Sequence, residues 1–574
     1  MKKIIYLTLP IFFIIGCSQQ SYKTLSVKDY MSKMKAGWIG QMAGVGWGGP
    51  TEFRWIDEII PEDSVPQWNP QMINQFNQDD IYVEMTFLRT LEKYGLDVSI
   101  RQAGIDFANS RYMLWHANKA GRDNLRAGIA PPYSGHPQFN HHADDIDYQI
   151  EADYAGLISP GLPQSAIDLG EKFGHIMNYG DGVYAGQFIA SMYAYAFFEN
   201  DIEKIIRSAL KCIPEKSQYY EAINDVLNWY HQFPDDWTKT WELIEEKYQR
   251  NPEYRKFSCS GPQSEFNIDA KINGAYVVVG LLYGHGNMDN TIKIAMRCGM
   301  DSDCNPSSAA GILATTLGLE NLPEKFTSAL DQKTKFSYTD YNFQKLTDVC
   351  VQLAEQTVKK YGGKVETKNG EKVFKIPVQH PTPGVFEQCW TADSVKIDPY
   401  FTEEEISRIT VKVRKPDEFI QLWQVSGPYL AKGKSVNELF DIVFPPEKGK
   451  GKWQKIQLGK NGLHKTNVQF HRIFGGKNRV AYAKTRFFSD KELPAILELG
   501  SDDGVKVWLN GRLIFKNNIT RGCMAAQDMV PLKIQKGWNE LLFKVTQGVG
   551  DWEMNACLTD TTGKALTKFK FTNN

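Results

Sequence analysis

The chain has no excess charge of either sign and, after its first residues, no long hydrophobic run. Its 574 residues carry 66 Lys and Arg against 67 Asp and Glu, a formal net charge of -1. This balance gives no electrostatic case for a nucleic-acid partner, which a basic surface would attract. After residue 17 no apolar segment is long enough for a membrane helix, so we expect the remainder to be soluble. A chain of this length can form two or three domains with ample cores.

Cysteine is sparse and follows no recognisable pattern. The chain has nine cysteines, and none of them forms a C-x-x-C pair or the close spacing of a disulfide framework. We therefore expect no structural zinc site. Disulfides in an oxidising compartment stay open as an alternative, because the spacing does not assign them.

The first residues are typical of a secretion signal. Two lysines precede the apolar run of residues 4–15, which is too short to span a bilayer comfortably and has the length of a signal peptide's hydrophobic region. Residues 14–17, Ile-Ile-Gly-Cys, resemble the cleavage box of a bacterial lipoprotein. We therefore predict a lipoprotein signal peptide over residues 1–17 and lipidation of Cys17. The mature protein would be anchored in the bacterial cell envelope, in the periplasm or at the outer-membrane surface.

The sequence changes character near residue 362. Before it, long amphipathic runs predict helices. After it, short runs that alternate apolar and polar residues predict strands, among them residues 409–413, 505–509 and 541–545. Asn510-Gly511 follows the second of these runs and is a strong signal for a type I′ hairpin turn.

These patterns predict a multi-domain protein. We expect an all-α domain over residues 22–362 and an antiparallel, jelly-roll-like β-sandwich over residues 370–574. The sandwich looks like the galactose-binding-like modules that follow many secreted glycoside hydrolases, which makes it a candidate for carbohydrate binding. Exposed aromatic side chains such as Trp508 or Trp552 would stack on a sugar, although large aromatic residues are more often buried.

Two pairs of aspartates stand at the starts of predicted helices. Asp79 and Asp80 open a pattern in which apolar residues recur at i, i+4 and i+7. Asp301 and Asp303 precede a helical segment for which Asn305 is the expected N-cap. Either pair alone is more often a helix cap, but four carboxylates together could bind one or two Mg²⁺-like ions. The spacing does not establish that the two helix starts meet.

Four separated motifs resemble, in the same order, those of ADP-ribosylglycohydrolases. They are GWIGQMAG at residues 37–44, Asp79-Asp80, NYGDG at residues 178–182 and GMDSD at residues 299–303. The resemblance covers roughly residues 25–360 and implies an all-helical domain with a dinuclear magnesium site. Carried over by position, the metal ligands would be Asp79, Asp80, Asp301 and Asp303, and Mn²⁺ or Ca²⁺ could take the place of Mg²⁺.

Several positions depart from the family's pattern. Gln78 and Ile81 flank the first aspartate pair where hydroxyl residues are usual, Cys304 stands in place of a threonine, and Gln41 stands where an aspartate is common. The loss of hydroxyl ligands would weaken one metal site or change the preferred ion. A thiolate at Cys304 would favour a softer ion such as Zn²⁺, whereas a protonated thiol packed beside the helix is the simpler interpretation.

The resemblance also implies catalytic and substrate-binding residues. Glu52, in a glycine-rich stretch, matches a mobile acidic residue that would position or deprotonate the attacking water, and Asp80 and Asp301 are the other catalytic candidates. A mobile surface loop is the alternative for Glu52. The substrate-binding candidates in the third motif are Asn178, Gly180, Asp181 and Gly182.

The acidic stretch of residues 144–153 adds two candidates for substrate binding, Asp144 and Asp147. On a single helix Asp144, Asp147 and Glu151 would share one face, where like charges repel one another. Such a face is either solvated, or a cation or a cluster of substrate hydroxyls offsets the repulsion. His141 and His142, just before it, would orient a substrate or cap the preceding loop.

Together these features predict a metal-dependent hydrolase of glycosidic bonds at a ribose-like or other furanose sugar. The signal and the sandwich favour a role in envelope glycan degradation. Two alternatives stay open: an ADP-ribosyl hydrolase of the family's usual kind, and a catalytically inactive surface glycan-binding lipoprotein. The expected partner is a carbohydrate or an ADP-ribose-like small molecule.

Overall fold

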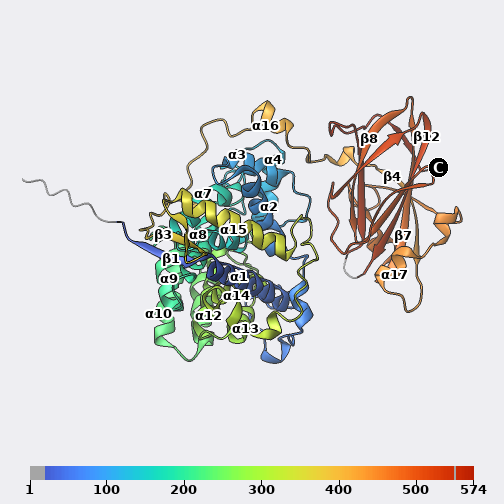
Figure 1. Cartoon of the computed structure of the whole chain (residues 1–574). Helices are drawn as coiled ribbons and strands as arrows, with labels where there is room; N and C mark the ends of the chain where they lie inside the picture. The colour runs from blue at the N-terminus through green and yellow to red at the C-terminus, as the bar shows by residue number, and fades with distance from the viewer. Residues whose placement is uncertain (1–19, 549–550, 574) are drawn as a thin grey trace, which may run out of the picture.

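The computed structural model of the chain describes residues 20–548 and 551–573. A helical domain and a β-rich domain are joined by a long segment that carries the short helix α16 (Glu403–Ser407), as Figure 1 shows. The predicted signal peptide and Cys17 lie outside the described residues. Within the described ranges, no helix combines the length and the apolar character that crossing a membrane requires.

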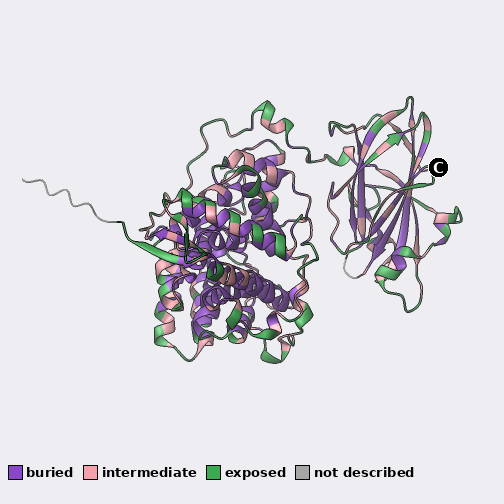
Figure 2. Cartoon of the chain, viewed as in Figure 1, coloured by how far each residue is buried: buried purple, intermediate pink, exposed green. Residues whose placement is uncertain are grey.

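The helical domain confirms the predicted all-α character of the first part of the chain. Figure 2 shows that the sides of its helices that face the interior are buried. Its helices are α1 (Val27–Gly48), α2 (Asp79–Tyr94), α3 (Ile100–Ala108), α4 (His116–Arg126), α5 (Asp147–Ile150), α6 (Asp153–Leu157), α7 (Pro163–Phe173), α8 (Asp181–Ala196), α9 (Ile202–Leu210), α10 (Gln218–Gln232), α11 (Trp237–Ile244), α12 (Ala270–Tyr283), α13 (Met288–Arg297), α14 (Cys304–Leu317) and α15 (Phe343–Lys360).

Helices α1 and α14 pack at very short range because α1 presents glycines along one face. A Cβ atom on Gly40, Gly44 or Gly48 would lie 2.4, 2.3 or 2.2 Å, respectively, from a backbone oxygen of α14 or of the turn before it. No carbon atom fits at such distances, so any larger side chain would push the two helices apart. The spacing of four residues places the three glycines on one side of α1. The last of them faces Ser302, between Asp301 and Asp303.

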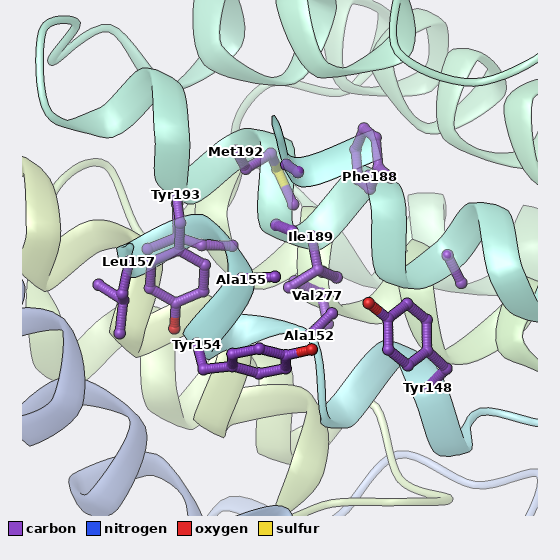
Figure 3. Close-up of a cluster of buried hydrophobic side chains, with 14 of the residues drawn as sticks. Tyr148, Ala152, Tyr154, Ala155, Leu157, Phe188, Ile189, Met192, Tyr193 and Val277 are labelled. Atoms are coloured by element: carbon purple, nitrogen blue, oxygen red, sulfur yellow. The ribbon is translucent and has the colours of Figure 1, made fainter. Parts of the chain in front are cut away.

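Aromatic side chains from α5, α6 and α8 fill the centre of the helical domain, as Figure 3 shows. Tyr154, Phe188 and Tyr193 are fully buried there. The hydroxyl of Tyr193 donates a hydrogen bond to Oδ2 of Asp153 at 2.9 Å. The two short helices α5 and α6 are therefore held against α8, and they carry part of the acidic stretch into the interior.

The chain stays on the helical domain after α15. Strand β3 (Glu371–Pro377) pairs antiparallel with both β1 (Tyr22–Ser26) and β2 (Lys364–Lys368). Phe401 and Ile409 belong to the helical core, whereas the core of the β-rich domain begins with Ile420. The segment that follows α15 thus wraps the helical domain, and the sandwich core begins well beyond residue 370.

The strand predicted at residues 409–413 is wrong. Ile409 is buried in the helical core, and the backbone N–H of Thr410 donates to Oδ1 of Asn109 at 2.7 Å. The alternating apolar residues attach the linking segment to α3 and its C-terminal cap. The side chain of Asn109 accepts the backbone hydrogen bond that a neighbouring strand would accept in a sheet.

The C-terminal domain has two antiparallel sheets around a shared core, which confirms the predicted sandwich architecture. In the larger sheet the order is β10-β9-β12-β7-β4-β5, with β14 beside β7, and in the smaller it is β11-β8-β13-β6. The bounds are β4 (Leu422–Tyr429), β5 (Gln454–Gln457), β6 (Val468–Gln469), β7 (Arg479–Ser489), β8 (Leu493–Asp502), β9 (Val505–Leu509), β10 (Arg512–Asn517), β11 (Asp528–Ile534), β12 (Gly537–Gln547), β13 (Glu553–Thr559) and β14 (Lys570–Thr572), with the short helices α17 (Val436–Asp441) and α18 (Phe470–Phe474).

Two expectations for the sandwich have opposite outcomes. The hairpin at Asn510-Gly511 is confirmed: both residues have positive φ, 51° and 81°, and they join β9 to β10. The expectation of an exposed tryptophan platform is wrong for Trp552, which has no exposed surface and packs on Phe470. Trp508 is half-buried.

Replacing Gly44 with alanine tests the close contact of α1 with α14. Alanine normally favours a helix over glycine by about 1 kcal/mol. Here the new methyl group would meet the carbonyl of Pro306, so we expect Gly44→Ala to lower the free energy of unfolding by about 2 kcal/mol. Chemical denaturation measures this change. Lys28→Ala, on the exposed side of α1, is the matched control and is expected to change stability by less than about 0.5 kcal/mol.

Candidate functional site

A cavity of about 460 Å³ lies beside the starts of α2 and α14. Aromatic side chains make up much of its wall, and one of them, Trp115, is 46% exposed. A concave site that combines apolar walls with a few polar groups is typical of small-molecule recognition. The lining residues used below are Glu52, Phe53, Asp79, Tyr82, Trp115, His116, Asn118, Asp147, Phe266, Ile268, Asp301, Cys304, Tyr338, Arg521 and Gly522.

The aspartates of the two predicted pairs converge at this cavity. Asp79 and Asp80 are the first two residues of α2, and Asp301 and Asp303 lie in the turn before α14. Oxygens of Asp80 and Asp303 lie within 4.8 Å of each other. Oxygens of Asp301, Asp303 and Glu52 also lie within 4.8 Å of one another. The two helix starts therefore meet, which the spacing in the sequence could not establish.

Helix α1 supports both pairs. Its glycines hold the turn of Asp301 and Asp303, and Gln41 donates a hydrogen bond from Nε2 to Oε1 of Glu84 in α2 at 2.5 Å. Glu84 also accepts from the backbone N–H of Tyr154 at 2.8 Å. Gln41, which departs from the family's pattern, thus connects α1 to the helix that begins with the first aspartate pair.

Three of the four aspartates are buried and have carboxylate oxygens without a hydrogen-bond partner among the described residues. Asp80 is 1% exposed, and neither of its carboxylate oxygens has a partner among the described residues. One carboxylate oxygen of Asp301 and one of Asp303 are also unpartnered. Buried carboxylates normally have hydrogen bonds or a cation to offset the cost of losing water. This set of hard oxygen atoms fits a divalent cation such as Mg²⁺, Mn²⁺ or Ca²⁺.

Burial raises the pKa of these acids. For Asp80, burial and then the charges of Asp303 and Asp79 raise the pKa well above its ordinary value. Burial is also the main cause of the raised pKa of Asp301 and of Asp303. Glu52 is exposed at the cavity, and partial desolvation there, followed by the charges of Asp303 and Asp79, raises its pKa to about 8. The cluster therefore holds protons unless a cation replaces them.

The start of α14 differs by two residues from the prediction. The N-cap is Asp303 rather than Asn305, and the helix begins at Cys304. Asn305 is inside the helix, and its side-chain amide donates to Oδ1 of Asn273 at 3.0 Å. Its amide thus connects α14 to α12, and the helix begins directly after the second aspartate of the pair.

Cys304 lies at the cavity floor with 6% of its surface exposed. Its Sγ lies within 4.8 Å of carboxylate oxygens of Asp80 and Asp303. Burial, and then the neighbouring carboxylates, raise the pKa of this thiol well above its ordinary value. These surroundings favour the protonated thiol over the thiolate.

The acidic stretch of residues 144–153 does not form the single helix with a shared acidic face. It consists of a turn followed by α5 and α6, and Asp144, Asp147 and Glu151 are all buried. Asp147 lines the cavity, where it accepts hydrogen bonds from the backbone N–H groups of Ala117 and Asn118 at 3.1 and 2.9 Å. The solvated-face interpretation is wrong because tertiary partners offset these charges.

Asp144 and Asp181 do not line the cavity. They surround the buried Nζ of Lys271, which lies 2.7 Å from Asp144, 3.7 Å from Asp269 and 4.0 Å from Asp181. This cluster connects the turn at residue 144 with α8 and α12. Both aspartates thus support the turn and α8 from outside the cavity lining.

The NYGDG motif supports the same turn from behind. Asn178 donates from Nδ2 to the carbonyl oxygens of Ala143 and Asp145 at 3.0 and 2.8 Å. Gly182 packs so closely that a Cβ atom would lie 2.7 Å from the carbonyl of Ala143, and Gly180 has a φ of 56°. None of these motif residues is among the described residues that line the cavity.

Several lining residues have no signal in the sequence. Trp115, Phe266 and Tyr338 come from separate segments that only the fold brings together. A loop of the β-sandwich also contributes: Arg521 and Gly522 lie between β10 and β11 and line the cavity. The Nε of Arg521 donates to the carbonyl of Ser501 at 3.1 Å, so the side chain is held in place.

Comparison with known proteins gives one assignment of family. The family model described as ADP-ribosylglycohydrolase matches residues 26–363. No curated protein matches the chain. A solved structure described as an "ADP-ribosylglycohydrolase-related protein complex" matches with a TM-score of 0.36 and 13% sequence identity, over 57% of this chain and 99% of that chain.

The raised pKa values predict how Mg²⁺ binding depends on pH. A carboxyl whose pKa is raised by folding keeps its proton in the folded state, so its contribution to stability is lost as the pH rises above the unfolded value of about 4. A bound cation would replace that proton. We therefore expect Mg²⁺ to raise the Tm more at pH 8 than at pH 5, as differential scanning fluorimetry measures.

Asp80→Asn is the comparison variant, because it removes one charge from the proposed ligands. In this variant the rise in Tm caused by Mg²⁺ should differ less between pH 8 and pH 5. An equal Mg²⁺ effect at pH 5 and pH 8 would contradict the assignment of these carboxylates as ligands.

Proposed function

Because the chain belongs to the ADP-ribosylglycohydrolase family, a family of hydrolases, we propose that it hydrolyses a glycosidic bond at a ribose-like or other furanose sugar. The observation that carries this proposal is the convergence of the two aspartate pairs beside one aromatic-walled cavity, where Asp80, Asp301 and Asp303 are buried with unpartnered oxygens. Such a site suits a polyol, because a cation held by the aspartates can bind vicinal hydroxyls.

Different residues of the cavity would bind the metal, transfer the proton and hold the sugar ring. A divalent cation held by Asp79, Asp80, Asp301 and Asp303 would hold vicinal sugar hydroxyls and lower the pKa of a water molecule. Glu52 reaches the cavity from the loop after α1 and is placed to exchange a proton with the attacking water. Trp115 and Phe53 offer apolar faces on which a sugar ring can stack.

We propose an envelope glycan as the substrate. The support for this comes from the signal-like first residues and from the β-sandwich that shares the wall of the cavity. A polymer or oligosaccharide bound along the sandwich would present its terminal furanose to the aspartates. In this proposal the sandwich acts as part of the substrate site.

Two further candidates have observations in their favour. The family match favours an ADP-ribosyl hydrolase, whose substrate also presents a ribose with cis hydroxyls. The absence of hydroxyl residues at Gln78, Ile81 and Cys304 favours an inactive glycan-binding lipoprotein. Against inactivity, all four aspartates are present, and Asp80, Asp301 and Asp303 lie close together beside Asp79 at the start of α2.

A direct assay separates these candidates. The soluble form that starts after Cys17 is tested on ADP-ribosylated protein and on a panel of furanoside-containing glycans, with and without a chelator. Chelator-sensitive release of a furanose from a glycan would support the proposal. Release of ADP-ribose alone would favour the second candidate, and binding without turnover would favour the third.

Replacing Asp301 with asparagine tests the role of the aspartates. The variant keeps the shape of the side chain and removes one ligand charge, so turnover should fall by at least a hundredfold while the fold is retained. Initial rates and circular dichroism measure the two properties. Asp123→Asn, on the exposed side of α4, is the matched control and should leave the rate unchanged. Full activity of Asp301→Asn would exclude the metal-assisted mechanism.

Replacing Arg521 with glutamine tests whether the sandwich takes part in substrate binding. Arg521 lies on the cavity wall, so the loss of its charge should raise KM for a glycan about tenfold, equivalent to about 1.4 kcal/mol, with little change in kcat. Arg512→Gln, at an exposed position of the same domain, is the control. Unchanged KM in both variants would mean that the sandwich loop does not contact substrate.

A further inference from the structure

A second set of metal-ligating side chains lies beside the cavity. His116, His142, Asp145 and Cys259 each place one ligand atom so that all four atoms lie within 4.8 Å of one another. They come from three segments: the first residue of α4, the turn before α5, and the loop before α12. None of the four residues belongs to the aspartate pairs at the starts of α2 and α14.

The distances are close to those of a tetrahedral metal site. Nδ1 of His142 lies 2.7 Å from Oδ2 of Asp145, and Nδ1 of His116 lies 3.5 Å from the same oxygen. In a tetrahedral zinc site with bonds of about 2.0–2.3 Å, neighbouring ligand atoms lie about 3.3–3.8 Å apart. A small outward shift of His142 would therefore open the space for an ion.

Two atoms of this cluster are buried and unsatisfied. Asp145 has no exposed surface, and its Oδ1 makes no hydrogen bond to the described residues. Nδ1 of His116 is likewise buried without a hydrogen bond. The backbone of His116 is also strained, with a φ of 42°, which an L-residue adopts only when its surroundings hold it there. These features are expected where side chains are arranged for a ligand.

The donor set selects the type of ion. Two imidazoles, a thiol and one carboxylate suit a borderline-soft ion with tetrahedral geometry, whereas the aspartate site offers mainly hard carboxylate oxygens. The Sγ of Cys259 lies within 4.8 Å of the other three ligand atoms, so it is placed to bind the same ion.

We propose that His116, His142, Asp145 and Cys259 form a Zn²⁺ site. The ion would fasten the loop of residues 256–268 to the start of α4. That loop places Phe266 and Ile268 on the cavity wall, and Phe266 stacks on His116 with ring centroids 5.8 Å apart. The site would thus shape one wall of the substrate cavity from outside the aspartate cluster.

Cobalt substitution tests this proposal without any variant. The mature protein is stripped with a chelator and titrated with Co²⁺. A thiolate-to-metal absorption band in the near ultraviolet and intense tetrahedral visible bands are expected, and Zn²⁺ should displace both. A titration that gives neither band would overturn the proposal.

Variants then assign the ligands. Elemental analysis of the purified protein should find one zinc per chain, and Cys259→Ser or His142→Gln should lose the zinc and the cobalt bands. Cys212→Ser, which replaces a free cysteine outside the cluster, should keep both. Retention of the bands in Cys259→Ser would overturn the assignment.

Asp301→Asn separates this site from the aspartate site. That variant should keep the cobalt bands even where turnover is lost. The proposal therefore stands or falls independently of the proposed hydrolase activity.

Discussion

The contact between α1 and α14 through glycine is the constraint on which the site depends. Gly44 and Gly48 let the backbone of α14 and its preceding turn approach closer than any side chain would allow. This approach holds Asp301 and Asp303 against α1, while Gln41 of the same helix binds Glu84 of α2. One helix thus brings together two pairs of carboxylates that are more than 200 residues apart in the sequence. Without that support each pair would be an ordinary helix start.

The buried charges of the aspartate site explain why it needs protons or a bound cation. Asp80 is buried with two unpartnered oxygens, next to further carboxylates that raise its pKa. The cost of burying these charges must be offset by protons or by a cation. The protein solves the same problem differently around Lys271, where an ammonium group neutralises the buried Asp144. Among the described residues no lysine or arginine forms an ion pair with the buried oxygens of Asp80, Asp301 or Asp303, which leaves that role to a metal ion or to protons.

The sequence predicts most of what depends on local pattern. The start of α2 at Asp79, the hairpin at Asn510-Gly511 and the change from helices to strands follow from capping, turn and periodicity rules. Long-range contacts explain the rest. Lys271 neutralises Asp144 from 127 residues away, and Arg521 reaches the cavity from another domain. Periodicity also misassigned residues 409–413, because an alternating segment can bind a side chain of the helical domain instead of a strand.

The central claim is that the four aspartates form one divalent-metal site. Crystals of the mature protein grown with Mn²⁺ and measured for anomalous scattering test it most directly. The account predicts an anomalous peak between the starts of α2 and α14, within bonding distance of oxygens of Asp80 and Asp303. The absence of an anomalous peak there in crystals grown with Mn²⁺, with these oxygens protonated or hydrogen-bonded to other side chains instead, would contradict it.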